Sequence, residues 1–417
     1  MSTRKKQRLL ILTNHFYPED FRVNELAFEL AKRNYEVTVI TAIPDYPQGK
    51  FFKGYSIFKR RKEKFYDVRI IRLLIIPRRH GNALRLILNY LSYLVSSLIF
   101  VFFHSLQTTY DAVLVHMTSP FFITLPGLYL KRRKGIPLIL WILDLWPESV
   151  AAAGGIKNQK LLRALDLMVK KVYAQSDKIL VSSNTFRESI NKKGNFADKL
   201  VYFPNWADSI PQVSFEGTYK SIEPFCSKTS SDFIFLFAGN LGEAQNIDFL
   251  LRAIAQMKLH SGVKFVFMGD GRKRVQLINI THILGLSDIC FFPGRFPQST
   301  MPYFMDRADV MLASLKRDPI FSLTVPAKVQ FYMSQGKAIL GVLDGEASRI
   351  IEESRCGLTV IPGDTQGFQS TVSQFLEFTK DQLLQLGDNG RLYYTENFAR
   401  EKRINQIESL IRSVVKP

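Results

Sequence analysis

The sequence predicts an α/β fold built from two doubly wound domains. Its 417 residues suffice for two domains of ordinary size. Short apolar runs that suit buried parallel strands alternate with segments of helical periodicity. The alternation stops near residue 205, at a segment rich in proline, glycine, serine and threonine, and then begins again. We therefore expect two similar domains in which strands and helices alternate.

In the first half, the apolar run at residues 9–13 ends in a polar turn. Residues 24–33 then carry apolar side chains at helical spacing, before the next apolar run at 37–41. This is the order of a strand–helix–strand unit. By the same criteria we expect strands at residues 69–76, 112–116, 138–143 and 178–182, and helices at 84–103 and 161–175.

The second half repeats this order after a linker that we place at residues 206–231. We expect strands at residues 233–238, 264–268, 289–292, 310–313 and 338–342, and helices at 249–258, 272–284 and 381–415. The expected domains are 1–205 and 232–395, with a helix at 396–417 that packs back on the first. Ligands of such folds bind beyond the carboxyl ends of the strands, so we expect the two domains to face each other across a ligand cleft.

Positive charge is concentrated in the first half. The chain has 56 Lys and Arg against 37 Asp and Glu, a net charge of +19. Residues 1–210 hold 33 basic and 16 acidic residues (+17), whereas residues 211–417 hold 23 and 21 (+2). Dense basic runs lie at 59–64 and 131–134. One-sided basic charge beside an apolar segment favours an anionic membrane surface over nucleic acid, for which no recognition motif is present.

That apolar segment, residues 86–103, has no charged residue and allows three interpretations. Its length just reaches that of a membrane span, but it contains Asn89, Ser92, Ser96 and Ser97. It can be a monotopic helix that dips into one leaflet, a helix of the soluble core, or a true span. The run at 9–13 is too short for a signal-peptide core, so we expect no cleavable signal peptide.

The three cysteines, Cys226, Cys290 and Cys356, form no closely spaced pair or Cys/His cluster. This disfavours a disulfide scaffold and a structural zinc site, and it fits a reducing cytoplasm.

Glycines follow three expected strands of the second half, at Gly239 and Gly242, at Gly269 and Gly271, and at Gly294. A glycine at this place lets backbone amides approach an anion, and the next helix N-terminus adds a favourable dipole. Glycine also marks ordinary turns, but three successive ones favour an anion site. No G-x-G-x-x-G or Walker loop occurs, which disfavours dinucleotide redox enzymes and ATPases.

The chain resembles the retaining glycosyltransferases of family 4 over nearly its whole length. Its most specific strings are DLWPES at 144–149 and PDYPQG at 44–49. Further matches are PNWAD at 204–208, GNLGEAQN at 239–246, GDG at 269–271 and PAK at 326–328. The subgroup that it resembles synthesises bacterial O-antigen, capsule and colanic-acid polysaccharides. The resemblance implies the GT-B fold, in which two Rossmann-like domains face each other across a cleft.

The resemblance also implies a function. The second domain would hold a nucleotide-diphosphate sugar, with UDP and an N-acetylated amino-sugar favoured. The first would hold a polyprenyl-diphosphate-linked acceptor at the cytoplasmic face of the bacterial inner membrane. The anomeric configuration would be retained, and neither a metal nor a cofactor would be needed.

The donor-binding residues that the resemblance and the glycine turns indicate are Gly239, Asn240, Leu241, Gln245, Gly269, Asp270, Gly271, Arg272, Gly294, Arg295, Pro326, Lys328 and Glu346. In the wider family an Arg and a Lys clamp the diphosphate, and Asn240 and Gln245 stand at their positions. Other cations must then supply the charge, with Arg272 and Lys328 as candidates.

A second departure concerns two glutamates, spaced eight residues apart, of which the second usually holds the ribose hydroxyls. Leu323 and Phe331 stand at these positions. Gln330 or Glu346 can substitute for the second. The alternative hypothesis is a catalytically degenerate GT-B module that acts as a binding or scaffold subunit.

On the acceptor side we expect Asp144, Glu148, His15 and His116 to serve catalysis and Glu19, Arg22 and Tyr46 to bind the acceptor. A carboxylate or imidazole at a strand end can orient the acceptor hydroxyl or accept its proton. For Asp144 and His116 structural roles also remain open, as a helix cap and as a buried core side chain.

Overall fold

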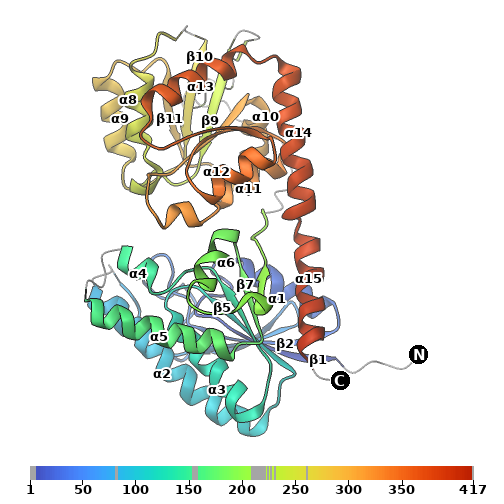
Figure 1. The fold of residues 1–417 in the computed structure, drawn as a ribbon. Coiled ribbons are helices and arrows are strands. Elements are labelled where there is room, and N and C mark those ends of the chain that lie inside the picture. Colours follow the sequence, from blue (N-terminus) through green and yellow to red (C-terminus); the bar gives the residue numbers. More distant parts are fainter. Residues whose placement is uncertain are drawn as a thin grey trace. The chain divides into compact units, whose positions relative to one another are not determined.

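The computed structural model describes residues 6–79, 83–152, 158–207, 222, 225, 228–229, 232–259 and 262–415. Most of the expected linker at 206–231 lies outside these residues. The chain divides into two compact units, one of Met1–Pro204 with Glu401–Pro417 and one of Asn205–Arg400 (Figure 1). Each unit is described by itself.

The first unit is built on an eight-stranded sheet of order β3-β4-β2-β1-β5-β6-β7-β8. All neighbouring strands are parallel except β3, which is antiparallel to β4. The strands are β1 (Gln7–Leu12), β2 (Tyr35–Ala42), β3 (Lys62–Phe65), β4 (Val68–Leu73), β5 (Ala112–Met117), β6 (Leu138–Ile142), β7 (Lys178–Val181) and β8 (Leu200–Tyr202). The central strands are buried over their whole length, which is why they are nearly continuous apolar runs.

The helices of this unit are α1 (Arg22–Lys32), α2 (Ala83–Gln107), α3 (Leu125–Lys134), α4 (Glu148–Ala152), α5 (Gln159–Gln175), α6 (Asn184–Asn191) and α15 (Arg400–Val414). Helix α3 packs against both α2 and α5 (Figure 1). Helix α15 buries Ile404, Ile407 and Ile411, and its Glu408 forms an ion pair with Arg33 at 3.0 Å. The C-terminal helix therefore belongs to the core of the first unit.

The second unit is built on a parallel six-stranded sheet of order β11-β10-β9-β12-β13-β14. Its strands are β9 (Phe233–Ala238), β10 (Val263–Met268), β11 (Cys290–Gly294), β12 (Val310–Ser314), β13 (Ala338–Val342) and β14 (Gly357–Val360). Its helices are α8 (Ile247–Ile254), α9 (Arg274–Ile283), α10 (Met301–Arg307), α11 (Ala327–Ser334), α12 (Glu346–Glu353), α13 (Thr365–Glu377) and α14 (Lys380–Asn397). The predicted α/β class with two doubly wound domains is confirmed.

Helix α2 buries its polar side chains and exposes its apolar ones. Asn89, Tyr93, Ser97, Val101 and Ser105 recur every four residues and are buried. Nine large apolar side chains are exposed instead: Leu84, Ile87, Leu88, Leu91, Val95, Ile99, Phe102, Phe103 and Leu106. The interpretation of this segment as a helix of the soluble core is therefore wrong. By length and composition alone, residues 84–107 could cross a membrane, and 22% of their most apolar window is buried.

The polar residues of α2 bind the segment that leaves β4. Ile76 N donates to Ser92 Oγ (2.9 Å), Asn89 Nδ2 donates to Ile76 O (2.8 Å), and Ser96 Oγ donates to Leu74 O (2.9 Å). The side chains of Leu74 and Ile76 remain exposed. Since they belong to a segment bound along α2, they extend its apolar face.

Candidate active site

A cavity of about 460 Å³ lies in the second unit, at the carboxyl ends of three neighbouring strands, β9, β10 and β11. Its lining residues are Ala238, Gly239, Asn240, Met268, Gly269, Asp270, Arg295, Phe296, Gln298, Met301 and Phe331. The expected donor residues Gly239, Asn240, Gly269, Asp270 and Arg295 thus lie together around one cavity. This is where open α/β sheets bind their ligands.

Gly269 is required by close packing of the first two turns. A Cβ at this residue would lie 1.8 Å from Gly239 O, and its φ is +143°. A Cβ at Gly271 would lie 2.4 Å from Leu241 O. The turns after β9 and β10 therefore touch through their backbones, and no other residue type fits at Gly269.

Several amides of these turns already have protein acceptors. Gly239 N donates to Met268 O, Gly269 N to Gly294 O, and Leu241 N to Asp270 O, at 2.8–2.9 Å. Gly242 N donates to the side chain of Gln245 at 3.1 Å. These amides hold the turns together, so an anion in the cavity depends more on a cation than the glycine pattern suggested.

Arg295 is the cation in the lining, and Lys328, in the first turn of α11, lies behind the lining residue Gly239. Lys328 Nζ lies 3.2 Å from where a Cβ of Gly239 would be, and 3.5 Å from the centre of the Phe237 ring. Part of the stem reaches the surface, but Nζ is buried and has no hydrogen-bond partner in the described part of the chain. Burial lowers the pKa of Lys328 to about 7. A buried amine without a protein acceptor is typical of a site that receives an anion.

Like Lys328 and Gly271, the remaining expected donor residues lie outside the lining of this cavity. Leu241 is fully buried in the apolar core, Gln245 holds the turn, and Arg272 is exposed. Pro326 precedes α11, and Gly294 ends β11. Glu346 is buried and accepts a hydrogen bond from Arg349 at 2.8 Å. Their expected part in donor binding stays a prediction.

Phe331 lines the cavity, one helical turn after Lys328 on α11. The neighbouring Gln330 is buried and donates to Asn205 O at 2.9 Å. An aromatic ring thus occupies the place where the resemblance puts a glutamate.

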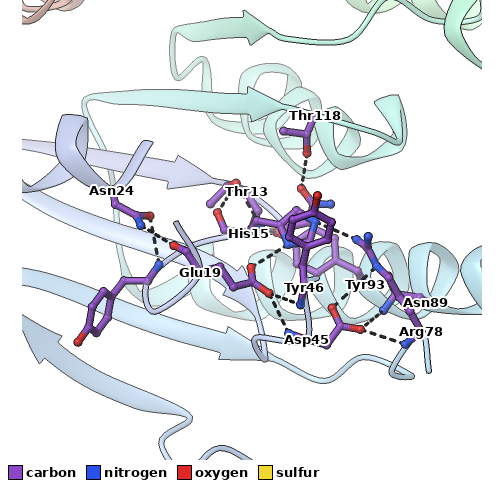
Figure 2. Close-up of polar contacts among 12 residues, drawn as sticks. Thr13, His15, Glu19, Asn24, Asp45, Tyr46, Arg78, Asn89, Tyr93 and Thr118 are labelled. Atoms are coloured by element: carbon purple, nitrogen blue, oxygen red, sulfur yellow. Dashed lines mark hydrogen bonds and ion pairs between the residues drawn. The ribbon is translucent and has the colours of Figure 1, made fainter. Parts of the chain in front are cut away.

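In the first unit, side chains meet at the carboxyl ends of β1, β2 and β4 (Figure 2). His15 Nδ1 lies 2.8 Å from Glu19 Oε2, and Glu19 Oε1 accepts the amides of Asp45 (2.8 Å) and Tyr46 (2.7 Å). His15, Glu19 and Asp45 are buried. Glu19 therefore fixes the loop after β2, and Tyr46, 44% exposed, is the part of this loop open to a ligand.

Arg78 also belongs to this cluster, although it was not among the expected site residues. Its Nη2 lies 2.8 Å from His15 Nε2, and its Nε donates to Asn89 Oδ1 at 3.2 Å (Figure 2). Its backbone amide donates to Asp45 Oδ2 at 3.0 Å. Burial raises the pKa of the Asp45 carboxyl, against the effect of this amide and of the Arg78 charge. Arg78 follows a strand in an irregular segment, where no periodicity or motif singles it out.

Asp144 follows β6 and accepts a hydrogen bond from Ser119 Oγ, which in turn accepts one from Trp146 Nε1 at 2.9 Å. The same loop bonds to the first strand, because Asn14 Nδ2 donates to Ser119 O at 3.1 Å. Asp144 is only partly buried. It is therefore oriented and remains accessible, as a carboxylate that meets an acceptor must be.

Three expected residues have other partners. Glu148 pairs with Lys193 at 2.5 Å, and Arg22 pairs with Glu25 at 2.9 Å on the first turn of α1. His116 is fully buried, and its Nδ1 lies 3.0 Å from Thr13 Oγ1. Burial lowers the pKa of His116 to about 3, which keeps the ring neutral. These contacts favour structural roles, as helix and core contacts.

Among the described residues, no group of three or more His, Cys, Asp and Glu side chains lies close enough to hold a metal ion. Cys290 and Cys356 are buried free thiols, and Cys226 lies outside the described residues.

Two family models match consecutive parts of the chain. The model described as "Glycosyl transferase 4-like domain" matches residues 21–206, and that described as "Glycosyl transferases group 1" matches residues 222–393. The chain belongs to the family 4 glycosyltransferases of the GT-B fold. The resemblance stated from its motifs is therefore confirmed.

This glycosyltransferase has curated bacterial relatives. The probable glycosyltransferase WbjE of Pseudomonas aeruginosa is 26% identical over 73% of this chain and 75% of its own length. The putative colanic acid biosynthesis glycosyl transferase WcaI of Escherichia coli K12 is 23% identical over 79% of this chain and 81% of its own.

Solved structures share its fold. The sucrose-phosphate synthase of Thermosynechococcus elongatus superposes with a TM-score of 0.72 at 15% identity, over 98% of this chain and 99% of that one. HepE of Anabaena, solved in complex with UDP, gives a TM-score of 0.63 at 13% identity, over 98% and 100%. At these identities the likeness concerns the fold alone.

Proposed function

We propose that this glycosyltransferase moves a sugar from a nucleotide diphosphate to a lipid-linked acceptor in the synthesis of a bacterial cell-surface polysaccharide. The donor is UDP-linked, with an N-acetylated amino-sugar favoured. The acceptor is a polyprenyl diphosphate that carries a sugar. The anomeric configuration is retained, and no metal is required.

The observation that carries this proposal is the buried amine of Lys328 beside Gly239. It offers positive charge where the donor diphosphate needs it, and it has no acceptor in the described part of the protein. The complex of HepE with UDP and the name of WcaI support the choice of donor and of pathway.

In the proposed reaction the bond between the anomeric carbon and the diphosphate oxygen breaks, and the acceptor hydroxyl forms the new bond to that carbon. Lys328 stabilises the charge that develops on the leaving diphosphate, while the cavity orients the donor. Asp144, held by Ser119, orients the acceptor hydroxyl. The hydroxyl proton leaves with the diphosphate oxygen.

The exposed face of α2 supports a lipid-linked acceptor and a peripheral place on the membrane. Nine of its large apolar side chains are exposed, and the adjacent α3 ends in Lys131, Arg132, Arg133 and Lys134. Apolar surface that lies next to clustered basic residues suits the interface of an anionic bilayer. The protein would lie on the cytoplasmic leaflet, where nucleotide sugars are available.

The test is a transfer assay with purified protein, a panel of nucleotide sugars and short-chain lipid-linked acceptors. We expect one donor–acceptor pair to give product, with the donor's anomeric configuration by NMR and with activity unchanged in EDTA. Absence of product together with absence of nucleotide binding by calorimetry would refute the proposal.

Phe331 favours a second candidate function, that of a catalytically degenerate GT-B module that acts as a binding or scaffold subunit. If Phe331→Glu creates or raises transfer, the native pocket has degenerated. If the substitution abolishes transfer that the native protein performs, Phe331 belongs to a working donor site.

A further inference from the structure

We propose that Arg78 binds the phosphate of the acceptor and so positions it beside Asp144. This inference rests on the proposed function, since it assigns a residue to the acceptor that the function requires. It concerns the first unit only and adds a residue that neither motif nor composition indicates.

The guanidinium of Arg78 is contacted by two aromatic rings and is hydrogen-bonded along one edge. The rings of Tyr46 and Tyr90 lie 5.6 and 5.5 Å from its Cζ atom, within the range of cation–π contact. Along the edge, His15 Nε2 and Asn89 Oδ1 accept from Nη2 and Nε. Its orientation is therefore set before any ligand arrives, which lowers the entropic cost of binding.

The opposite edge of the guanidinium is open. Nη1 has no hydrogen-bond partner among the residues that the structure describes, and it is not a buried atom. The side chain as a whole is 16% exposed. An arginine that is fixed on one edge and open on the other offers planar donors to a phosphate oxygen.

The partners of Arg78 leave its charge largely available. Arg78 has only donors, so His15 Nε2 accepts from it, and His15 Nδ1 donates to Glu19. Asn89 is neutral. Asp45 forms an ion pair with Arg78, in which Oδ1 lies 3.8 Å from Nε, while its Oδ2 accepts from the amide of Arg78 and the side chain of Asn89. This separation exceeds that of a hydrogen bond, so Asp45 offsets the Arg78 charge only in part.

The position suits an acceptor that is carried by a lipid. Asn89 and Tyr90 belong to α2, the helix with the exposed apolar face. Tyr90 also lies within electrostatic reach of Asp144, whose charge raises the pKa of the Tyr90 hydroxyl after the larger effect of burial. Arg78 therefore contacts two residues of the helix with the exposed apolar face, and one of them, Tyr90, lies near the carboxylate assigned to the acceptor hydroxyl.

The test measures binding of farnesyl diphosphate, farnesyl phosphate and farnesol to the full chain, with the donor cavity saturated by UDP. The variants are Arg78→Gln, Arg78→Lys and, as control, Arg79→Gln, since Arg79 is an exposed arginine next in sequence. We expect Arg78→Gln to weaken the binding of farnesyl diphosphate at least tenfold and to leave the affinities for farnesol and UDP unchanged. Arg78→Lys should restore part of the affinity, and Arg79→Gln should match the native protein.

A second arm separates the acceptor from membrane lipid. Vesicles of phosphatidylcholine with 30% phosphatidylglycerol are sedimented with each variant. If Arg78→Gln sediments with the vesicles as the native protein does, the proposal is supported. If Arg78→Gln alone loses vesicle binding, Arg78 binds a lipid headgroup and the proposal is wrong. If UDP binds and Arg78→Gln leaves farnesyl diphosphate affinity unchanged, the inference is wrong while the proposed function stands. Failure of UDP to bind at all would refute the function itself.

Discussion

At the scale of single residues, Lys328 combines burial with the lack of a protein acceptor. Taking an ammonium group out of water is costly unless an opposite charge compensates it, and its pKa of about 7 reflects that cost. The asparagine and glutamine at positions 240 and 245 carry no charge. Lys328 and the cavity-lining Arg295 are therefore the cations on which diphosphate binding should depend.

We predict that nucleotide binding weakens as the pH rises above 7. A bound diphosphate raises the pKa of Lys328 above its value of about 7 in the empty protein. The contribution to binding is thus complete below pH 7 and is lost as the pH rises toward the pKa of the complex. Titration calorimetry with UDP between pH 6 and 9 should show Kd rising by up to about tenfold per unit. Lys328→Met should bind weakly at every pH, and a native profile without slope would contradict the assignment.

Gly269 allows a stability prediction with a matched control. In Gly269→Ala the new Cβ would collide with Gly239 O, so we expect a loss of about 2–5 kcal/mol in the free energy of unfolding. Gly285 also has a positive φ, +69°, but open space around it, so Gly285→Ala should cost only about 1–2 kcal/mol. Denaturant unfolding compares the two, and equal losses would exclude the close contact as the cause.

The sequence predicted the grouping of the expected donor residues better than that of the acceptor residues. Gly239 and Gly269 lie in short strings directly after strands, where local pattern and resemblance both apply. The side chain of Arg78 is positioned by His15 and Asn89, which lie 63 and 11 residues away in the sequence. Only the folded chain brings these residues together. Glu19 was found, but its role was not, because the amides that it binds belong to another loop.

At the scale of elements, α2 explains why residues 86–103 were ambiguous. Their polar residues, which argue against a membrane span, face inward and bind residues 74–76. Composition alone cannot tell which face of a helix meets the protein. Strand β3 was missed for a related reason, because its alternating charges read as a basic cluster, although charges are common on edge strands.

The apolar face of α2 can be tested by charge insertion. Val95→Lys with Ile99→Lys should reduce sedimentation with anionic vesicles at least tenfold, because two charges then meet the bilayer interface. The control is Val275→Lys with Ile283→Lys on α9 of the second unit, where the same two residue types are 70% and 83% exposed. The control should bind like the native protein. Equal loss in both would point to a general effect of apolar surface.

At the scale of the whole molecule, the boundary between the basic and the nearly neutral half of the chain lies close to the boundary between the two units. The excess of +17 belongs to residues 1–210, almost the same residues as the sheet of the first unit, and the remaining +2 to residues 211–417. The strand–helix order and the domain count were predictable because each unit repeats one local pattern. The chain returns to the first unit through α15, as expected for the helix at 396–417, and the buried side chains of Ile404 and Ile407 hold it there.

We predict that the C-terminal helix stabilises the first unit. Ile407→Ala removes a fully buried side chain and should lower the free energy of unfolding by about 2–4 kcal/mol. The exposed Ser409 of the same helix provides the control, since Ser409→Ala should change it by less than about 0.5 kcal/mol. Urea unfolding followed by circular dichroism compares them. An unchanged midpoint for Ile407→Ala would mean that α15 is not part of this core.

The most direct measurement is the affinity of UDP and of farnesyl diphosphate for two variants, Lys328→Met and Arg78→Gln. If the second unit holds the donor and the first the acceptor, Lys328→Met weakens the binding of UDP at least tenfold. The affinity for farnesyl diphosphate, measured with UDP at saturation, stays unchanged in this variant. Arg78→Gln then does the reverse. A result in which each variant weakens both ligands equally, or neither, would contradict this division of work between the two units.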